Sequence, residues 1–438
     1  MKKVFIIMVA ATLAVSSCKK DEITPVVNNT LNAKARDALN DLMNDWYYWY
    51  KELPTVTLSD YKDPYELLDA LRYKKYDRWS FVEDYTSYVS SMQGTFVGHG
   101  IRIGLSPDNK TRIVMIYKNS PMYALGVRRG WIIKKLNGTE LAPVFIAKDW
   151  TQYGQLIGAS TTGVENTFLF QTPRGNDTTI VTKKSSFQVN SVTYYDTLNL
   201  KSGKTGYLVF DEFITPSSEE LKTAFSFFKQ NNTTDLILDL RYNSGGLVSV
   251  AVELASYIAG LPTTSVLVKS DFNDKKASNN ESTFFKTMQY PLNMSRVVII
   301  STRETASASE IIVNGLKPYM NVVLVGDTTN GKPTGMNVWS YQNKFIFAPI
   351  TFKLVNSQNQ GDFFGGFAPN KYVIDDITHD FGDRREYCLR EAISYMETGA
   401  FTSKGAYVYS PVTYRSERPE WMKNAFFGIT TLKDKSRD

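Results

Sequence analysis

A run of small, hydroxyl-bearing residues, Thr305-Ala-Ser-Ala-Ser309, lies between an apolar stretch at 297–300 and a helix-like stretch at 308–319. A serine such as Ser307, between a buried strand and a helix N-terminus, lies where backbone N–H groups favour a developing negative charge. Lys332 follows the next predicted strand along the chain. A lysine amine kept neutral by burial can take the proton of a serine hydroxyl, so this pattern permits nucleophilic catalysis without histidine. Small residues before a helix also serve as caps, so the pattern alone fits a structural role as well.

The sequence contains few residues that could serve histidine-based catalysis or bind a metal ion. Its 438 residues include two histidines, His99 and His379, and two cysteines, Cys18 and Cys388. A zinc site takes three or four ligands, most often from these residue types, and a disulfide framework takes several cysteine pairs, so neither is expected. His379 lies in a charged, turn-like stretch and is expected to be exposed. The sequence also lacks the Gly-x-Ser-x-Gly, His-Glu-x-x-His and phosphate-binding glycine motifs, so we expect no metal and no cofactor.

Three stretches together resemble the carboxy-terminal processing peptidases, also called tail-specific proteases. They are Thr305-Ala-Ser-Ala-Ser-Glu-Ile311, the Gly-Lys pair at 331–332, and the loop Asp239-Leu-Arg-Tyr-Asn-Ser-Gly-Gly246. The resemblance implies that Ser307 is the nucleophile, that Lys332 is the general base, and that Ser309 is structural. Further similar stretches extend the resemblance from residue 35 to residue 400, in the family's order.

The same resemblance implies an oxyanion hole built from two backbone amides. One amide belongs to Ala308, directly after the nucleophile, and the other to Gly245 or Gly246, between which the sequence does not choose. Removing one such donor costs about 2.7–4 kcal/mol of transition-state stabilisation. Asp239 and Arg241 are expected to orient this glycine loop rather than to take part in the chemistry.

The sequence departs from the family at one position near the lysine. Many members carry a Gln four residues after it, where the side chain can orient the amine, whereas this chain has Met336. Thr334, Asn337 or Gln342 could replace that glutamine, or packing alone could hold the lysine. The departure leaves the serine-lysine pair in place and leaves room for slow or substrate-gated activity.

Residues 93–186 contain short β-like runs broken by glycine and proline. Three features follow one another there: Val97-Gly-His-Gly-Ile-Arg-Ile-Gly104, Ser120-Pro-Met-Tyr-Ala-Leu-Gly-Val-Arg-Arg-Gly130, and a strand closed by Asn137-Gly138. Their order and spacing resemble a PDZ module, in which an open sheet edge takes an extended peptide and loop amides hold its terminal carboxylate. The resemblance assigns peptide binding to Gly98, His99, Gly100 and Ile101. A β-rich spacer without a ligand is the structural alternative.

The whole pattern predicts an α/β multidomain protein. Residues 33–92 indicate an N-terminal helical segment, 93–186 the PDZ-like β-rich module, and 187–400 a layered α/β core in which buried strands alternate with helices. The resemblance implies a ClpP/crotonase-like protease core for this last region. Residues 401–438 form a polar C-terminal extension to which the sequence assigns no role.

The N-terminus resembles a bacterial lipoprotein signal. Two lysines precede the apolar run 4–15, which is too short to span a hydrocarbon core about 30 Å thick. Val15-Ser-Ser-Cys18 resembles a lipobox, so we expect residues 1–17 to be removed, Cys18 to be lipidated and residues 18–32 to form a lipidated tether. An ordinary signal peptide with an incidental cysteine is the alternative. The protein is expected to be exported, as an outer membrane lipoprotein facing the periplasm or the cell surface.

Composition sets the broad class and the partners. Hydrophobic residues make up 42% and charged residues 21%, ordinary values for a folded soluble protein. The formal net charge of +6 includes two lysines of the expected signal and is too small to indicate a nucleic-acid partner. We expect protein or peptide substrates with free C-termini, and membrane contact through the lipid anchor.

Two further features have structural interpretations. The aromatic run Trp46-Tyr-Tyr-Trp-Tyr50 is expected to pack in a core rather than to form a glycan platform, because no convergent polar set accompanies it. Cys388 lies in a helical pattern and is expected to be a buried apolar side chain. The sequence thus predicts an exported, lipid-anchored serine endopeptidase with a PDZ module. A peptide-binding pseudopeptidase or adaptor is the main alternative, and a glycan-binding lipoprotein is the third.

Overall fold

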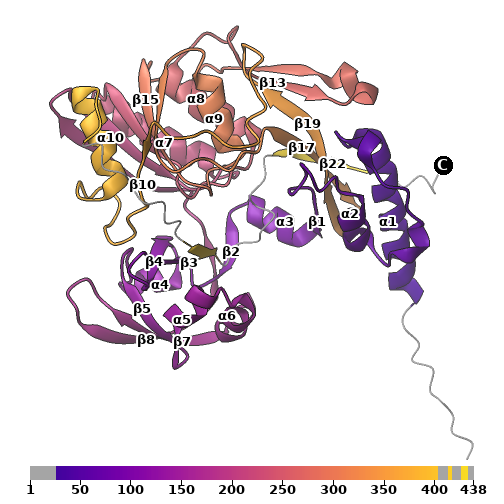
Figure 1. Cartoon of the computed structure of the whole chain (residues 1–438), viewed down its shortest axis with the longest axis horizontal. Coiled ribbons are helices and arrows are strands. Elements are labelled where there is room, and N and C mark those ends of the chain that lie inside the picture. Colours follow the sequence, from indigo (N-terminus) through magenta and orange to yellow (C-terminus); the bar gives the residue numbers. More distant parts are fainter. Residues whose placement is uncertain (1–25, 403–412, 417–425, 433–438) are drawn as a thin grey trace, which may run out of the picture.

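The computed structural model describes residues 26–402, 413–416 and 426–432 of the chain. Figure 1 shows a layered α/β body, a smaller β-rich module below it, and the N-terminal helices α1 (Val26–Trp46) and α2 (Pro64–Leu71) beside the body. The predicted signal and the predicted lipidation site Cys18 lie outside the described residues. The mixed α/β, multidomain fold class predicted from the sequence is confirmed.

The body is built on a six-stranded sheet in the order β10-β11-β12-β15-β16-β20. Its strands are β10 (Val192–Leu200), β11 (Gly203–Phe210), β12 (Asp235–Asp239), β15 (Arg296–Ser301), β16 (Asn321–Gly326) and β20 (Lys371–Tyr372). All neighbours pair in parallel except β10, which runs antiparallel to β11. The residues of β12 and β15 are buried almost throughout, as parallel strands covered on both faces require.

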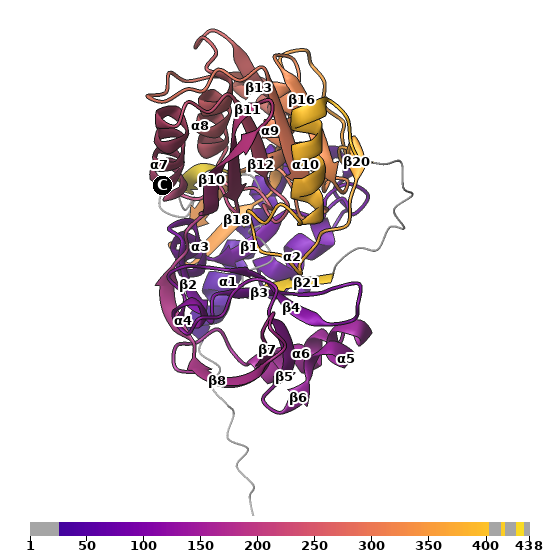
Figure 2. The same cartoon turned by 90° about the vertical axis from the view of Figure 1, so that its left-hand side faces the viewer.

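Helices cover both faces of this sheet, as Figure 2 shows. They are α7 (Ser217–Gln230), α8 (Val248–Ala259) and α9 (Ala308–Leu316) on one face and α10 (Tyr387–Thr398) on the other. Alternate residues of a strand serve the two faces: in β15, Val297 packs under α7–α9, whereas Val298 packs under α10. Cys388 is buried in the cluster under α10, which confirms its structural interpretation.

A second, antiparallel sheet carries the strand that follows Lys332. Its order is β1-β18-β17-β19-β13-β14, with β22 paired in parallel to β17. Its strands are β1 (Phe81–Asp84), β13 (Val266–Phe272), β14 (Glu281–Phe284), β17 (Thr334–Tyr341), β18 (Phe345–Ala348), β19 (Ile350–Val355) and β22 (Phe426–Thr431). The N-terminal segment therefore contributes a strand to the body, and α3 (Tyr85–Met92) follows that strand directly.

The aromatic run at 46–50 packs against this second sheet. Tyr47 is fully buried, and the ring of Trp46 lies 5.2 Å from the ring of Trp339 in β17, centroid to centroid. Core packing is thus confirmed for the run, and the platform of exposed rings that a glycan site requires is not formed by these residues.

The predicted tether is wrong from Val26 onward, because α1 begins at that residue. The first residues of α1 include two asparagines and a threonine, which are poor helix formers, and for this reason the sequence pattern favoured an extended chain. Farther along the helix, Ala35, Leu39 and Met43 are buried against α2 and the second sheet. Extending a helix that packing has already nucleated costs little, so the helix continues into the polar stretch.

The β-rich module has its own sheet in the order β21-β3-β4-β5-β7-β8, with the short β6 beside β5. Its elements are β3 (Ile101–Leu105), β4 (Thr111–Ile116), α4 (Pro121–Ala124), β5 (Ile132–Leu136), β6 (Thr139–Glu140), α5 (Leu141–Ala147), α6 (Trp150–Ile157), β7 (Glu165–Gln171), β8 (Asp177–Lys183) and β21 (Thr413–Ser416). A separate pair, β2 (Thr95–Gly98) with β9 (Ser185–Gln188), flanks it. Asn137 and Gly138 have φ values of 49° and 84°, the left-handed values that the predicted two-residue hairpin turn needs.

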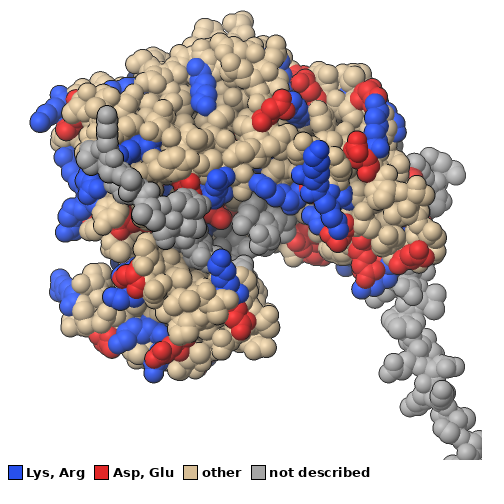
Figure 3. All heavy atoms as spheres, in the orientation of Figure 1, with Lys and Arg blue, Asp and Glu red and all other residues tan. Residues whose placement is uncertain are grey.

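The surface of the described residues shows no segregation of charge on the face in Figure 3, where Lys and Arg are interspersed with Asp and Glu. Such mixing produces no single-sign field to steer a charged partner to that face. Within the described ranges, no helix combines the length and the apolar character that crossing a bilayer requires.

Candidate active site

Ser307 lies where the chain passes from β15 into α9, and it is the residue that precedes the first turn of this helix. Its backbone has φ 59° and ψ −110°, a conformation that costs a non-glycine residue about 1–3 kcal/mol. Its side chain is buried, and Oγ has no hydrogen-bond partner among the described residues. Strain and an unsatisfied hydroxyl at one residue are typical of a serine held ready for attack at a strand-to-helix turn.

Hydrogen bonds join the glycine loop at 239–246 to the turn that carries Ser307. The N–H of Ala306 donates to the carbonyl of Asn243 at 3.1 Å. The hydroxyl of Ser309 donates to the same carbonyl at 3.0 Å. Ser309 therefore serves the structure, as predicted, and the two loops form one unit around Ser307.

The carboxylate of Glu310, in the first turn of α9, joins the serine turn to the lysine loop. Its Oε2 accepts the N–H of Ser307 at 2.9 Å and the N–H of Lys332 at 2.8 Å. Its Oε1 accepts the N–H of Gly331 at 2.7 Å and the hydroxyl of Thr329 at 2.6 Å. Burial raises the pKa of Glu310, and these hydrogen bonds oppose that rise. Four donors fill the lone-pair sites of an ionised carboxylate, whereas a protonated carboxyl group would direct its own donor at one of them.

Sequence reasoning did not single out Glu310. A visible signal was the Ser-x-x-Glu spacing from Ser307, which is that of a capping box, in which the glutamate accepts the N–H of the residue that begins the helix. The spacing could not show the other three donors. They come from the loop at 329–332, which reaches Glu310 only in the folded chain.

Lys332 follows β16 and is fully buried. Burial disfavours the ammonium form, so the pKa of Lys332 lies well below its ordinary value, although the charges of Asp77 and Glu310 oppose this shift. The Lys332 Nζ lies 5.8 Å from the ring centroid of Trp79. A buried amine with a lowered pKa is the chemical group that a lysine general base requires.

The N-terminal segment supplies the acid behind Lys332, which the sequence did not assign. Asp77 is buried, and its carboxylate accepts the hydroxyl of Tyr47 at 2.7 Å and the N–H groups of Trp79 and Ser80, both at 2.9 Å. The hydroxyl of Ser80 also donates to it, at 2.5 Å. These contacts fix the side chain of Asp77, whose charge acts on Lys332.

Gly245 is the loop residue that touches the serine turn. A Cβ at this position would lie 2.9 Å from the Cβ of Ser307 and 3.1 Å from the nitrogen of Ala308, and the φ of 108° favours glycine. The N–H of Gly245 donates to Oδ1 of Asn243 at 2.9 Å. Gly245 thus lies against Ser307 and Ala308 with its own amide held by Asn243, whereas Gly246 lies against the carbonyl of Phe213.

A buried ionic network holds the other end of this loop. The guanidinium of Arg241 donates to Asp239 at 2.7 Å and to both Asp375 and Glu386 at 2.8 Å. The hydroxyl of Tyr242 donates to Asp375 at 2.6 Å. Asp239 and Arg241 therefore fix the loop through side-chain contacts that do not reach Ser307, in keeping with the predicted orienting role.

The β-rich module contacts the same loop. Arg102, in β3, donates to the carbonyl of Tyr242 at 3.1 Å and to Asp211 at 3.3 Å. Arg129 donates to the hydroxyl of Tyr242 at 2.8 Å. Two arginines of the module thus hold the residue that lies three positions before Gly245, and they connect the module to the glycine loop.

The residues predicted to bind a peptide carboxylate connect β2 to β3. Gly98 ends β2 and Ile101 begins β3, with His99 and Gly100 between them. The His99 side chain is buried and lies 2.7 Å from Oδ1 of Asn166, and burial lowers the pKa of His99 to about 4. The imidazole of His99 therefore faces the module's interior, and only the backbone of this loop is placed to meet a ligand.

The side chain of Met336 lies in the apolar core of the second sheet, so no hydrogen bond to the lysine comes from this position. Of the three candidates to replace it, Asn337 accepts the hydroxyl of Thr351 at 2.8 Å, and Gln342 lies in the turn between β17 and β18. Thr334 is fully buried two residues after the lysine, and among the described residues its Oγ1 has no partner. Thr334 is therefore the candidate nearest in sequence with an uncommitted oxygen.

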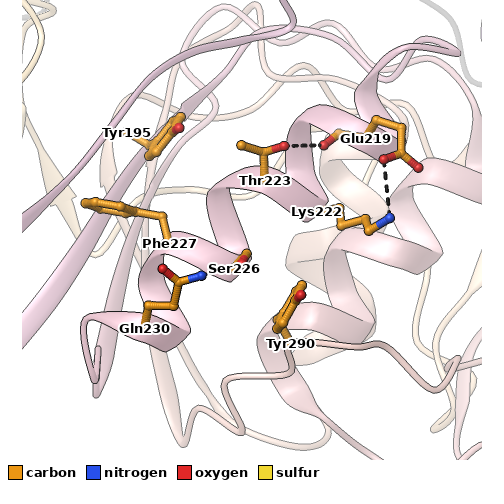
Figure 4. A pocket seen from close by; sticks show the side chains of 8 residues that line it. All are labelled: Tyr195, Glu219, Lys222, Thr223, Ser226, Phe227, Gln230 and Tyr290. Atoms are coloured by element: carbon orange, nitrogen blue, oxygen red, sulfur yellow. Dashed lines mark hydrogen bonds and ion pairs between the residues drawn. The ribbon is translucent and has the colours of Figure 1, made fainter.

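A surface pocket of about 370 Å³ lies elsewhere on the body, along α7 (Figure 4). It is lined by Tyr195, Glu219, Lys222, Thr223, Ser226, Phe227, Gln230 and Tyr290. None of the residues predicted to be functional lines this pocket. In the described ranges, no cluster of His, Cys, Asp and Glu has the composition of a metal site.

Two family models match the chain. The model of peptidase family S41 matches residues 204–373, which include the glycine loop, Ser307 and Lys332, and the model of the peptidase S41 N-terminal domain matches residues 34–81. The chain is similar to peptidase family S41 in both of these segments. The family resemblance found in the sequence is confirmed, and Asp77 lies within the N-terminal match.

Curated relatives agree with the S41 assignment. A probable CtpA-like serine protease of Staphylococcus saprophyticus is 25% identical over 291 residues, which cover 66% of this chain and 55% of the relative. One of Staphylococcus aureus, with the same name, is 28% identical over 264 residues, which cover 59% of this chain and 48% of the relative. The match thus spans about half the length of these curated relatives.

A solved structure agrees with the S41 fold. The putative S41 protease of Bacteroides fragilis superposes with a TM-score of 0.66 at 21% identity, and the match covers 82% of this chain and 96% of that one. At this level of identity the likeness concerns the fold, which the two chains share over 82% of this chain.

Proposed function

We propose that this chain is a serine endopeptidase of the carboxy-terminal processing type, with Ser307 as nucleophile and Lys332 as general base. The observation that carries the proposal is the shared carboxylate oxygen of Glu310. Because one oxygen accepts the N–H groups of both residues, their backbone nitrogens lie within about 6 Å of each other. A strained serine with an unengaged hydroxyl and a buried lysine are thereby fixed in one site.

In the proposed reaction, Lys332 Nζ takes the proton of the Ser307 hydroxyl while Oγ attacks the scissile carbonyl carbon. The amides of Ala308 and of Gly245 or Gly246 stabilise the oxyanion that forms. The protonated lysine then gives its proton to the leaving amine, and the acyl-enzyme results. A water molecule, deprotonated by Lys332, hydrolyses the ester and regenerates the serine.

The test is covalent labelling of Ser307 with a fluorophosphonate, read by intact mass and accompanied by a proteolysis assay. Ser307→Ala and Lys332→Ala should each abolish labelling and turnover, since removing a member of such a unit typically costs about 10⁴-fold or more. Ser226→Ala, on α7 and remote from the site, is the matched control and should label like the unmodified chain. Turnover retained in Ser307→Ala contradicts the assignment.

Substrates are proposed to be proteins whose free C-terminal ends the β-rich module captures, acting as a PDZ domain. Support comes from the β3 edge and from the loop at 98–101 that precedes it, the arrangement that β-strand addition uses. Arg102 and Arg129 connect this module to the glycine loop at 239–246, so a peptide that binds the module can shift this loop at the catalytic site. Fluorescence anisotropy with peptides that differ only in a free or amidated C-terminus tests this capture, which predicts binding of the free form alone.

The second candidate function is a peptide-binding pseudopeptidase or adaptor of the same family. Met336 favours it, because its apolar side chain replaces a residue that can orient the lysine. This candidate would be established if the chain binds peptides but shows neither labelling of Ser307 nor turnover under any condition.

Export and a lipid anchor at Cys18 are proposed from the N-terminal pattern, with the outer membrane as destination. Mass spectrometry of the protein from membranes should find Cys18 acylated at a new N-terminus. Cys18→Ser should leave the uncleaved signal or release the protein from the membrane fraction, whereas retention of a processed Cys18→Ser chain in membranes contradicts the anchor.

A further inference from the structure

The outer edge of β3 is occupied by the chain's own C-terminal extension. β21 pairs antiparallel with β3, from Thr413 opposite Leu105 to Ser416 opposite Arg102. Figure 2 shows β21 alongside β3, between the module and the body. A sheet edge offers one row of unpaired N–H and C=O groups, and β21 takes the row that an added peptide strand needs.

The direction of β21 is that of a C-terminal peptide. β3 begins at Ile101, directly after the loop at 98–100. Because the pairing is antiparallel, Ser416, the C-terminal end of β21, lies beside the start of β3 and hence on the side of that loop. A peptide whose terminal carboxylate meets the loop amides must run the same way along β3. β21 differs from such a peptide in that the chain continues beyond Ser416.

The extension also reaches the catalytic half of the molecule. Its second strand, β22, pairs in parallel with β17, which begins two residues after Lys332. At the other end of the extension, Ser416 lies opposite Arg102, whose guanidinium donates to the carbonyl of Tyr242 in the loop at 239–246. One segment of chain therefore adds a strand both to the predicted peptide edge and to the sheet that carries the lysine loop.

We propose that residues 413–416 are an intramolecular ligand of the β3 edge, which a substrate's C-terminal peptide must displace. The interaction surface is the β3 edge with the loop at 98–100, and its two competing occupants are β21 and an extended peptide with a free carboxylate. This inference rests on the proposed function and names how access to its peptide site is regulated.

The competition has a measurable size. A tethered segment acts at an effective concentration in the millimolar range, so it excludes weakly binding peptides and admits those that bind well. If β21 fills the edge in about nine molecules of ten, the apparent affinity of an external peptide is about tenfold below its affinity for the open edge.

A reversible trap tests the proposal in the full chain, in a Cys18→Ser background. Leu105→Cys combined with Thr413→Cys places two thiols at directly opposed positions of the β3–β21 pair. The matched control combines Leu105→Cys with Ser416→Cys. At about 3.4 Å per residue, Ser416 lies about 10 Å from the Thr413 position, which is too far for a disulfide to Leu105→Cys. Peptide binding is read by the anisotropy of a fluorescein-labelled peptide ending in apolar residues with a free carboxylate, with Ser307→Ala present to prevent cleavage.

The expected result is that mild oxidation cross-links the opposed pair and not the control, that the cross-linked chain no longer binds the peptide, and that dithiothreitol restores binding. Replacing residues 413–416 by Gly-Ser-Gly-Ser should strengthen binding about tenfold in the same assay. Equal binding by the cross-linked and reduced forms, absence of a cross-link in the opposed pair, or no gain in the Gly-Ser replacement each overturns the proposal.

Fluorophosphonate labelling of matching chains that retain Ser307 separates this proposal from the proposed function. If Ser307 is labelled at the normal rate but peptide affinity is the same with and without the cross-link, the competition between β21 and the peptide is refuted and the proposed function is not. Loss of labelling in the unmodified chain refutes the dyad and leaves the binding result to be judged by itself.

Discussion

Glu310→Gln should disable the site while leaving the fold in place. The change replaces one carboxylate oxygen by an NH₂ group, so two of the four groups that now donate to Glu310 meet another donor. Hydrogen bonds to a charged acceptor contribute about 1.5–3 kcal/mol each, so losing two costs about 3–6 kcal/mol. The serine turn and the lysine loop then separate, and a misplacement of about 1 Å is worth about 100-fold in rate.

The assay is the second-order rate of fluorophosphonate labelling at Ser307, with thermal unfolding followed in parallel. Glu391→Gln is the matched control, because Glu391 is also buried and also accepts hydrogen bonds, from Thr402, but lies on α10. We expect Glu310→Gln to label at least about 100-fold more slowly and Glu391→Gln to lose stability with its labelling rate unchanged. A folded Glu310→Gln chain that labels at the normal rate would refute the reasoning.

Two further predictions follow from the buried lysine and the glycine loop. Burial holds the pKa of Lys332 below its ordinary value of 10.5, so the unfolded chain binds a proton at this residue that the folded chain lacks. The contribution of Lys332 to the free energy of unfolding therefore rises with pH up to that value. The rate of labelling at Ser307 should rise over the pH range in which the amine of the folded chain loses its proton. Lys332→Met should therefore raise the melting temperature at neutral pH and abolish labelling, with exposed Lys344→Met changing neither; a lower melting temperature in Lys332→Met would contradict the burial argument. Gly245→Ala forces a Cβ to within 2.9 Å of Ser307 and should slow labelling by about 100-fold or more, whereas Gly365→Ala, which meets no atom within 4 Å, should not; equal labelling of the two variants would show that the close approach is unimportant.

The parts of the site that the sequence predicts are those carried by local pattern. The apolar run before Ser307 and the periodic residues after it predict β15 and α9, since each has the period of its own secondary structure. The resemblance to the carboxy-terminal processing peptidases implies that Ser307 and Lys332 meet, and the structure brings their backbones to one carboxylate. The Asn137-Gly138 hairpin is predicted for the same reason, because the turn chemistry is local.

What the sequence could not predict depends on contacts between distant segments. Asp77 lies behind Lys332 only because the N-terminal segment joins the second sheet, and a residue's type does not reveal its partner 255 positions away. His99 was expected in a ligand loop, yet its ring turns inward to Asn166. The four residues of β21 include the strand-favouring Thr413 and Tyr414, but a run this short does not predict a strand, because the edge it joins decides its structure.

The joining of the N-terminal segment to the second sheet also sets the order in which the molecule can mature. The Oγ of Ser80 accepts the N–H of Ile350, 270 positions later, and β1 pairs with β18. Contacts of such separation form late, because a long loop must close before they add stability. A chain made from its N-terminus therefore contains Asp77 long before Lys332, and β18, the strand that pairs with β1, is made only after about four-fifths of the chain. The topology thus defers assembly of the site until most of the chain has been made.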